Sequence, residues 1–262
     1  MNGRAIGLLL CAVVAVCTAC SGSASRTVTT NTPDGTRTAI VHRPVNVQPG
    51  APLVIVLHGS GGTGAIARAR SGWDAVADRE GFVVAYPDGI GNSWNGGACC
   101  RPASVRGIDD VGYLHQLVGQ LAAEDGIDPR HVVAGGFSNG GIMAFAWACQ
   151  RPGDLTGIAP LAGLVLVPCA QPGPVSVVAV YGSADTLVPP TDPPPGQPTA
   201  EQSVAPFRAG CYAGSSERTG PAAVTTWGCP DGRSVTLELI DGLGHDWPAG
   251  AAEFAWERLR PG

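Results

Sequence analysis

Short apolar segments that alternate with helical segments constrain the fold more than any other feature of this sequence. Residues 52–57 form a continuous apolar run of strand length, which is typical of a strand covered on both faces. Residues 109–124 instead repeat apolar residues at helical spacing. This alternation predicts an α/β fold, a mainly parallel sheet with helices on both faces. Strands are predicted at 52–57, 82–86, 131–134, 157–161, 175–181 and 235–240, and helices at 65–79, 109–124, 139–150 and 251–259.

Two further segments lie outside this alternation. Residues 27–30 and 36–42 are β-rich and flank the turn signal Asn-Thr-Pro-Asp-Gly, which predicts an N-terminal β-hairpin. Residues 189–198 contain six prolines and follow a predicted strand. Such a segment is a semi-rigid surface loop, which either borders a substrate cleft or is a tolerated insertion.

The N-terminus has the layout of an export signal. Arg4 precedes an apolar run that reaches about Val16, and this run is short for a membrane span. Cys20 follows small residues in a way that resembles the lipobox of bacterial lipoproteins, although Cys17 stands where that motif usually has leucine. We therefore predict a signal peptide over 1–19, a tether over 20–26 and one domain over 27–262. The alternative is an ordinary secretory signal cleaved after Ala24.

The chain contains nine cysteines, of which six remain once the signal and the lipidated Cys20 are set aside. An even number in an exported protein predicts disulfides. Cys211 and Cys229 flank a polar, turn-rich loop, and Cys149 and Cys169 flank a helix-to-strand passage, so each pair is a candidate local bridge. The adjacent Cys99 and Cys100 form either a vicinal bridge or links to other cysteines. Paired CxxC and HExxH patterns are absent from the sequence, so no metal site is predicted.

Composition excludes several functional classes. Charged residues are 14% of the chain, the net charge is −5, and every basic residue is arginine. Nucleic-acid binding needs clustered cations that displace phosphate counterions, so this composition argues against it. The 44% hydrophobic content argues against disorder, and 262 residues suffice to bury a core.

Gly136-Phe137-Ser138-Asn139-Gly140 is the strongest chemical signal in the sequence. It follows the predicted strand at 131–134 and begins the predicted helix at 139–150. A G-x-S-x-G motif at a strand-to-helix turn is the nucleophile elbow of α/β-hydrolases. The helix N-terminus would favour negative charge that develops beside Ser138.

A serine hydroxyl needs a base, and the base needs an acid that orients it. In α/β-hydrolases the chain order is serine, acid, histidine. Asp185 follows the predicted strand at 175–181, and His245 follows the strand at 235–240, so both would lie at the carboxyl edge of a parallel sheet. The remaining candidates are interpreted as structural or as helix caps: His42, His115, His131, Asp109 and Asp110.

The loop after the strand at 52–57 reads His58-Gly59-Ser60-Gly61-Gly62. A glycine-rich turn at this point places one backbone donor of an oxyanion hole, and the residue after the nucleophile supplies the other. The predicted donors are the N–H groups of Ser60 and Asn139, with His58 as a structural or hole-shaping residue. The alternative is a glycine turn that only reverses the chain.

These motifs together resemble one family. LHGSGG (57–62), YPDG (86–89), SWN (93–95), CC (99–100), DDVGY (109–113), GFSNGG (136–141), GSAD (182–185) and GHDWP (244–248) resemble, in this order, the polyhydroxybutyrate depolymerase-like esterases, which include feruloyl and acetylxylan esterases. The resemblance implies an α/β-hydrolase fold and the triad Ser138, Asp185 and His245. Trp94 and Trp247 match motif positions of the family, so with His58 they are candidates to line the substrate cleft; the alternative for the two tryptophans is burial in the core.

The resemblance implies an exported serine carboxylesterase without a cofactor. Expected substrates are short-chain, hydroxyalkanoate polyester, or feruloyl and acetyl glycan esters. We expect an extracellular or envelope monomer, attached to the membrane only through lipid at Cys20. Two alternatives stay open: an acyltransferase that uses the same acyl-enzyme, and a catalytically silent lipoprotein that binds ligands.

Overall fold

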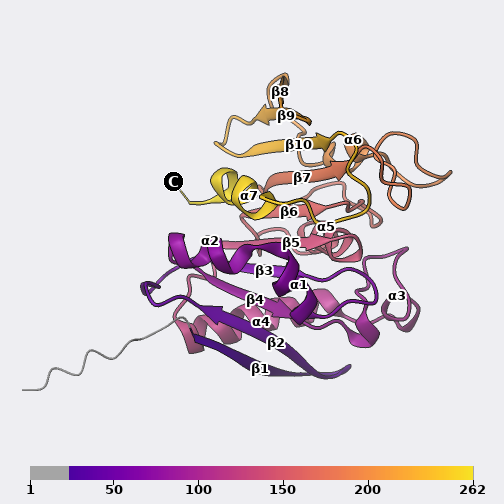
Figure 1. Ribbon diagram of the computed structural model, residues 1–262. Helices are drawn as coiled ribbons and strands as arrows, with labels where there is room; N and C mark the ends of the chain where they lie inside the picture. Colours follow the sequence, from indigo (N-terminus) through magenta and orange to yellow (C-terminus); the bar gives the residue numbers. More distant parts are fainter. Residues whose placement is uncertain (1–23, 262) are drawn as a thin grey trace, which may run out of the picture.

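The computed structural model describes residues 24–261, in which ten strands form one sheet (Figure 1). From one edge to the other these are β1 (Ala24–Thr32), β2 (Gly35–Arg43), β4 (Val83–Pro87), β3 (Leu53–Leu57), β5 (Val132–Phe137), β6 (Gly157–Leu161), β7 (Ser176–Gly182), β10 (Ser234–Ile240), β9 (Ala222–Gly228) and β8 (Ser215–Thr219). The strands from β4 to β10 in this order are parallel, and antiparallel strands close both edges. The predicted α/β fold with its N-terminal hairpin is confirmed.

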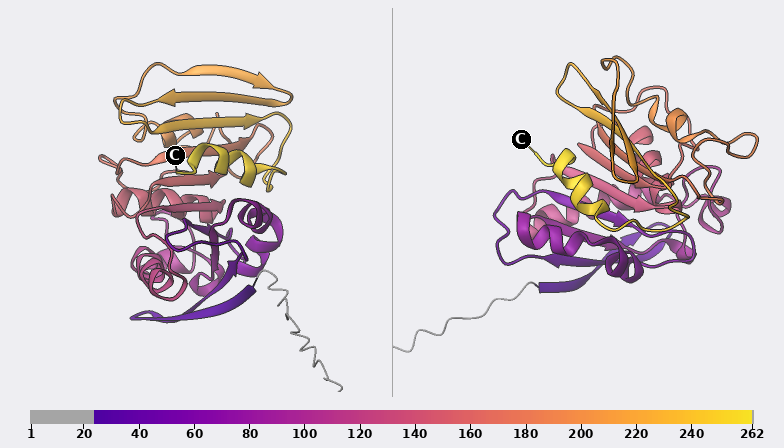
Figure 2. Two further views of the ribbon diagram at one scale, coloured as in Figure 1. Left: turned by 90° about the vertical axis from the view of Figure 1, so that its left-hand side faces the viewer. Right: turned by 45° about the horizontal axis from the view of Figure 1, so that its top comes forward.

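Helices cover both faces of the sheet (Figure 2). One face packs in an apolar cluster with α1 (Gly64–Ser71), α2 (Trp73–Glu80) and α7 (Ala251–Leu259). The opposite face packs with α4 (Asp110–Asp125), α5 (Asn139–Gln150) and α6 (Ala200–Val204). The connection from β4 to α4 carries two short elements, η1 (Ile90–Asn92) and α3 (Ala103–Arg106).

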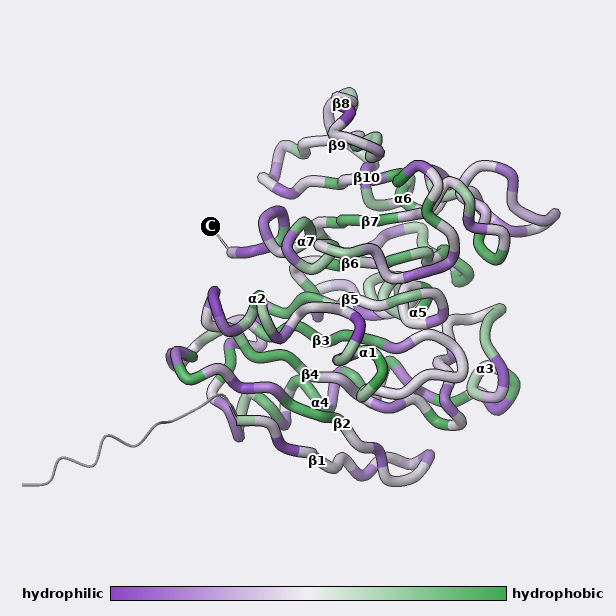
Figure 3. Tube along the Cα trace, in the orientation of Figure 1, coloured by the Kyte–Doolittle hydropathy of each residue, from purple (hydrophilic) through white to green (hydrophobic). Residues whose placement is uncertain are grey.

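Burial on both faces explains why the central strands could be recognised from their composition. All five residues of β3 and all five of β4 are buried, and the central strands are among the most apolar parts of the trace in Figure 3. The edge strand β8 is exposed along its whole length. Strands at the centre therefore need uninterrupted apolar runs, whereas an edge strand does not.

The predicted signal peptide and Cys20 lie outside the described residues. Strand β1 begins at Ala24, which pairs with Arg43 of β2, so residues 24–26 belong to the sheet and not to the predicted tether. Within residues 24–261 no helix combines the length and apolar composition needed to cross a bilayer.

Two sequence predictions about local structure were wrong. The helix expected over 65–79 is two helices, because Gly72 adopts the left-handed conformation (φ 78°) that ends α1 and precedes α2. The loop expected between Cys211 and Cys229 contains the hairpin β8–β9. Its first strand, Ser-Ser-Glu-Arg-Thr, is entirely polar and has no apolar alternation to reveal it.

The three candidate cysteine pairs are confirmed as disulfides. Cys149–Cys169 ties the end of α5 to the segment after β6, and Cys211–Cys229 closes the β8–β9 hairpin. The vicinal pair Cys99–Cys100 lies in the connection between β4 and α4.

The topology positions the functional loops. The chain passes from β3 to β4 on one side, then crosses to β5 on the other side of β3. The carboxyl ends of β3 and β5 are neighbours, with Leu57 opposite Gly136 in the register. Such a switch point leaves a crevice beyond the strand ends, which is where parallel α/β sheets bind ligands.

Candidate active site

Ser138 occupies the turn between β5 and α5 in an unusual backbone conformation. Its φ is 53° and its ψ is −117°, a combination that costs a non-glycine residue on the order of 1–3 kcal/mol. The turn is held because the Ser138 N–H donates to the Leu161 carbonyl (2.8 Å) and the Ser138 carbonyl accepts from the Ile142 N–H (2.9 Å). This is the geometry of a nucleophile elbow, which presents the hydroxyl above the sheet edge.

The glycines of the motif are required by close backbone approach. A methyl group on Gly136 would overlap the Gly140 carbonyl, and one on Gly140 would overlap the carbonyl oxygen of Leu57. The turn can therefore close against β3 only if both residues lack a side chain. This contact also ties the nucleophile turn to the loop that carries Ser60.

We expect Gly140→Ala to destabilise the protein by about 1–3 kcal/mol or more, because the rigid Leu57 carbonyl must move to admit the methyl group. Gly119→Ala is the matched control. Gly119 lies exposed within α4 with nothing near the position of an added Cβ, so alanine should stabilise the helix by about 0.5–1 kcal/mol. Urea unfolding measures both effects, and a similar free energy of unfolding for the two variants would contradict the argument.

Asp185 and His245 form a hydrogen-bonded pair. His245 Nδ1 lies 2.7 Å from Asp185 Oδ2, and the Asp185 side chain is 1% exposed. The other oxygen, Oδ1, accepts the N–H groups of Leu187 and Val188, both at 2.8 Å. An ionised carboxylate only accepts hydrogen bonds, so the Nδ1 proton of a neutral imidazole faces Asp185 and Nε2 is left as the free base.

Sheet pairing brings these two residues together. Asp185 follows β7 and His245 follows β10, and the two strands are parallel neighbours with Ile240 opposite Gly182. A methyl group on Gly182 would overlap the Leu243 carbonyl, so the two loops are in close contact. The pairing of β7 with β10 thus places Asp185 and His245, which are 60 residues apart in the chain, within hydrogen-bond distance.

Aromatic packing places His245 beside the nucleophile turn. Its ring centroid lies 4.6 Å from that of Phe137, the residue before Ser138. Phe137 also packs against Trp247 at 5.2 Å. The hydrogen bonds of the described residues include none between the Ser138 hydroxyl and His245, a contact that is often long until the transition-state complex forms. Phe137 was missed by the sequence analysis; its position next to the nucleophile was the only signal.

Half-buried Trp247 lies at the same edge, next to the histidine loop. The preceding residue, Asp246, forms an ion pair with Arg70 of α1. This exposed pair links α1 to the loop that carries both His245 and Trp247. The position of Trp247 is compatible with its expected place in the substrate cleft.

The two expected oxyanion donors lie in neighbouring loops, Ser60 after β3 and Asn139 after β5. Ser60 is exposed after β3, and an added Cβ on the adjacent Gly59 would lie 3.6 Å from Ser138 Cβ. In the part of the chain that the structure describes, the N–H groups of Ser60 and Asn139 donate to no backbone carbonyl. Both amides therefore remain available to a ligand at the N-terminus of α5.

His58 does not line a cleft, which corrects one expectation, but its surroundings agree with the interpretation as a structural residue. It is 1% exposed, its Nε2 accepts the Gly89 N–H (3.0 Å), and its Nδ1 donates to the Gly59 carbonyl (2.8 Å). Burial lowers the pKa of His58 from its ordinary value of 6.5, and the Gly59 hydrogen bond and Asp88 oppose this only in part. His58 is therefore a neutral residue that shapes the loop and not a second base.

This burial predicts a pH dependence of stability. A histidine whose pKa is lowered on folding contributes stability that is present above about pH 6.5 and is lost as the pH falls below it, because the unfolded chain binds the proton more readily. We expect the difference in free energy of unfolding between wild type and His58→Gln to shrink from pH 6.5 to 5. One proton changes it by at most about 1.4 kcal/mol per pH unit. Urea unfolding across this range measures it, and a constant difference would refute the assignment.

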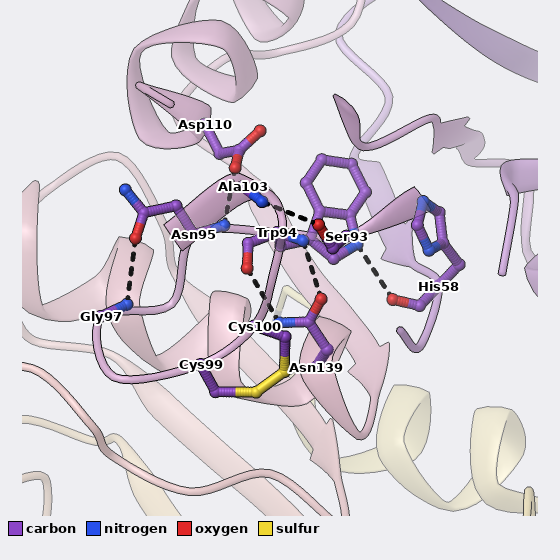
Figure 4. Close-up of a disulfide and its surroundings, with 10 residues drawn as sticks. All are labelled: His58, Ser93, Trp94, Asn95, Gly97, Cys99, Cys100, Ala103, Asp110 and Asn139. Atoms are coloured by element: carbon purple, nitrogen blue, oxygen red, sulfur yellow. Dashed lines mark hydrogen bonds between the residues drawn. A yellow bond between two sulfur atoms is a disulfide. The ribbon is translucent and has the colours of Figure 1, made fainter. Parts of the chain in front are cut away.

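Trp94 is also buried, with 0% exposure, so of its two interpretations burial in the core is the right one and a place in the cleft is wrong. Its ring packs 4.9 Å from that of His58. The reason is tertiary: Trp94 lies in the connection between β4 and α4, and this connection packs against the loop of His58 and the start of α5 at Asn139, to both of which Trp94 is hydrogen-bonded (Figure 4).

A buried ion pair near Trp94 was also missed. Arg37 donates to Asp110 at 2.7 Å, and their side chains are 2% and 0% exposed. Burial raises the pKa of Asp110, while the Asn95 N–H and Arg37 oppose the change. Only Asp109 acts as the expected helix cap, accepting the Gly112 N–H. The sequence pattern Asp109-Asp110 does not indicate that Asp110 is buried while Asp109 caps the helix.

The other histidines contact carboxylates elsewhere. In the described residues each lies near an aspartate other than Asp185, which agrees with the structural interpretation. The pairs are His42–Asp78 at 2.8 Å, His115–Asp154 at 3.0 Å and His131–Asp128 at 3.3 Å.

Comparisons with known proteins show that the chain is similar to esterases. The profile of the Phospholipase/Carboxylesterase family matches residues 104–193. The chain is 34% identical over 236 residues to "Putative esterase NocK" of Nocardia uniformis subsp. tsuyamanensis, covering 78% of this chain and 68% of that protein. A bifunctional acetylxylan esterase/xylanase of Neocallimastix patriciarum is 27% identical over 222 residues, which are 83% of this chain but only 32% of that longer protein.

A solved structure supports the fold. The acetyl xylan esterase from Aspergillus awamori superposes with a TM-score of 0.69 at 18% sequence identity, covering 89% of this chain and 98% of the other. At this identity the likeness concerns the arrangement of the sheet and helices. It agrees with the parallel sheet whose carboxyl edge carries Ser138, Asp185 and His245.

Proposed function

Because the chain belongs to the polyhydroxybutyrate depolymerase-like esterase family of α/β-hydrolases and is a carboxylic ester hydrolase, we propose that it acts through a covalent intermediate on Ser138. The observation that carries this proposal is the convergence of two features at one sheet edge. One is the positive-φ turn at Ser138, and the other is the 2.7 Å pair of His245 and Asp185. A hydroxyl, a free imidazole nitrogen and a buried acid are the parts that serine catalysis needs.

The proposed reaction has two halves. Ser138 Oγ attacks the ester carbonyl carbon while His245 Nε2 accepts the hydroxyl proton, and the carbonyl oxygen becomes an oxyanion held by the Ser60 and Asn139 N–H groups. Collapse breaks the bond to the leaving alcohol, which takes the proton from His245. Water then attacks the acyl-enzyme, His245 accepts its proton, and the carboxylic acid leaves as Ser138 recovers its hydrogen. Asp185 stays ionised throughout.

The substrate and location are part of the same proposal. Substrates are short-chain esters, hydroxyalkanoate polyesters, or acetyl and feruloyl esters of glycans; the acetylxylan esterase named above supports the last class. Three disulfides support export to an oxidising compartment. Anchoring through lipid at Cys20 follows from the sequence motif. All the proposed catalytic residues come from one chain, so a monomer suffices.

A fluorophosphonate probe tests the nucleophile. The probe phosphonylates only an activated serine, so peptide mass spectrometry should find the label on Ser138. The matched control is His245→Ala, which keeps Ser138 but removes its base and should lose the labelling. Labelling of a different serine, or equal labelling of His245→Ala, would overturn the proposal. A panel of acetyl, butyryl, feruloyl and hydroxybutyrate-oligomer esters then ranks the substrate classes.

A further inference from the structure

Trp94 is fully buried although it belongs to no helix or strand, and its side chain makes a specific polar contact. It lies in the connection between η1 and α3 and is 0% exposed. Its indole Nε1–H donates to the His58 carbonyl at 2.9 Å (Figure 4). His58 stands two residues before Ser60, so the indole is hydrogen-bonded to the loop that carries one proposed oxyanion donor.

The backbone of Trp94 is hydrogen-bonded to Asn139, the residue that carries the other proposed donor. The Trp94 N–H donates to Asn139 Oδ1 at 2.7 Å, and the Trp94 carbonyl accepts from Asn139 Nδ2 at 3.0 Å. Asn139 is itself fully buried and directly follows Ser138. Trp94 therefore joins both walls of the proposed oxyanion hole from a third loop.

The loop of Trp94 is itself hydrogen-bonded to the buried Asp110–Arg37 ion pair. The Asn95 N–H donates to Asp110 Oδ2 at 2.7 Å, and Asp110 Oδ1 accepts from Arg37 at 2.7 Å. The guanidinium of Arg37 lies 5.8 Å from the Trp94 ring. The Cys100 N–H adds a hydrogen bond to the Trp94 carbonyl at 3.1 Å. Buried ion pairs contribute little net stability, whereas a network of this kind restricts the loop to one arrangement.

Resting on the serine mechanism proposed above, we propose that Trp94 is a positioning residue that sets the spacing between the Ser60 and Asn139 amides. Oxyanion donors stabilise the transition state only when they are aimed at the position of the developing charge. Loss of the spacing should therefore slow the chemical step while ground-state binding of the ester changes little.

The test compares two tryptophans that differ in place but not in chemistry. Trp94→Phe removes the indole donor to His58 and keeps an aromatic ring. Trp147→Phe is the matched control, because Trp147 is also 0% exposed and its Nε1–H donates to Asp154 at 3.0 Å. Trp147 lies nine residues beyond Ser138 along the chain, about 13 Å along the axis of α5. Each variant loses the one hydrogen bond that a buried indole donates.

We expect Trp94→Phe to lower kcat about 10- to 100-fold with KM within about threefold, and Trp147→Phe to keep kcat within about threefold at a similar loss of Tm. Fluorophosphonate titration sets the concentration of active enzyme. An alkyl trifluoromethyl ketone, to which Ser138 adds to form an oxyanion, should bind Trp94→Phe more weakly by the same factor as kcat/KM falls. Should Trp94→Phe fail to fold, Asn139→Leu removes the other link, the two hydrogen bonds between the Asn139 side chain and the Trp94 backbone, and is judged by the same criteria.

Three results would overturn the inference: an unchanged kcat in Trp94→Phe, an equal loss of kcat in Trp147→Phe, or a loss confined to KM. These outcomes are separable from failure of the serine mechanism. If that mechanism fails, the wild type itself is neither labelled at Ser138 nor inhibited by the ketone. If only the inference fails, the wild type reacts with both probes and Trp94→Phe matches it.

Discussion

Ser138→Ala is expected to lower kcat for ester hydrolysis by about 10⁵- to 10⁶-fold, because no acyl-enzyme can form without the hydroxyl oxygen. The fold should be retained. In the described part of the chain the Ser138 turn is held by hydrogen bonds of its backbone, which the loss of the hydroxyl leaves in place. Hydrolysis of p-nitrophenyl acetate measures the activity, and urea unfolding measures the stability.

Ser216→Ala provides the control for this variant. Ser216 is exposed on the edge strand β8, where its hydroxyl contacts Thr225, and it should keep wild-type activity. If Ser138→Ala retained more than about 1% of the wild-type kcat, a different group would have to be the nucleophile.

Asp185→Asn is expected to lower kcat by about 10⁴-fold through a change of the histidine tautomer. The N–H groups of Leu187 and Val188 both donate to Oδ1, so they select this position for the oxygen of the new amide. The amide nitrogen then faces His245 Nδ1, which must accept a hydrogen bond in place of donating one. The imidazole proton moves to Nε2, where it blocks transfer from Ser138.

Asp192→Asn tests whether the effect of Asp185→Asn is local. Asp192 lies exposed in the proline-rich loop 189–198 after the same strand, and its amide should leave kcat unchanged. The measured quantity is kcat/KM for ester hydrolysis, compared between Asp185→Asn and Asp192→Asn. A loss below about tenfold in Asp185→Asn would mean that the pair does not orient the base.

The sequence was most informative where a local pattern reflects a local physical requirement. Central strands are buried on both faces, so β3, β6 and β7 had to be continuous apolar runs. Helices α5 and α7 were predicted with the bounds that the structure has, because their turns and apolar spacing lie within the segment itself. The same holds for the elbow at Ser138, where the glycines are required by a backbone contact between residues four apart, Gly136 and Gly140, and by contact with the end of β3.

Prediction failed where pairing partners decide the conformation. Strand β8 is polar throughout and forms only because β9 offers it a ladder of hydrogen bonds. The break at Gly72 depends on two short helices packing separately on the sheet, although a single helical pattern runs across it.

The chemistry of this protein was thus largely determined by the sequence: the alternation that forms a parallel sheet, and a serine, an acid and a histidine that each follow a strand in the order the fold requires. Only the tertiary structure decided which aromatic residues lie beside the nucleophile turn at the carboxyl edge of the sheet. Trp94 and Trp247 both stand in short motifs with polar neighbours, yet the first is fully buried and the second is half-buried against Phe137, the residue before Ser138. Burial of a single side chain depends on contacts between segments far apart in the chain, such as Trp94 with His58 and Asn139, and no local spacing encodes them.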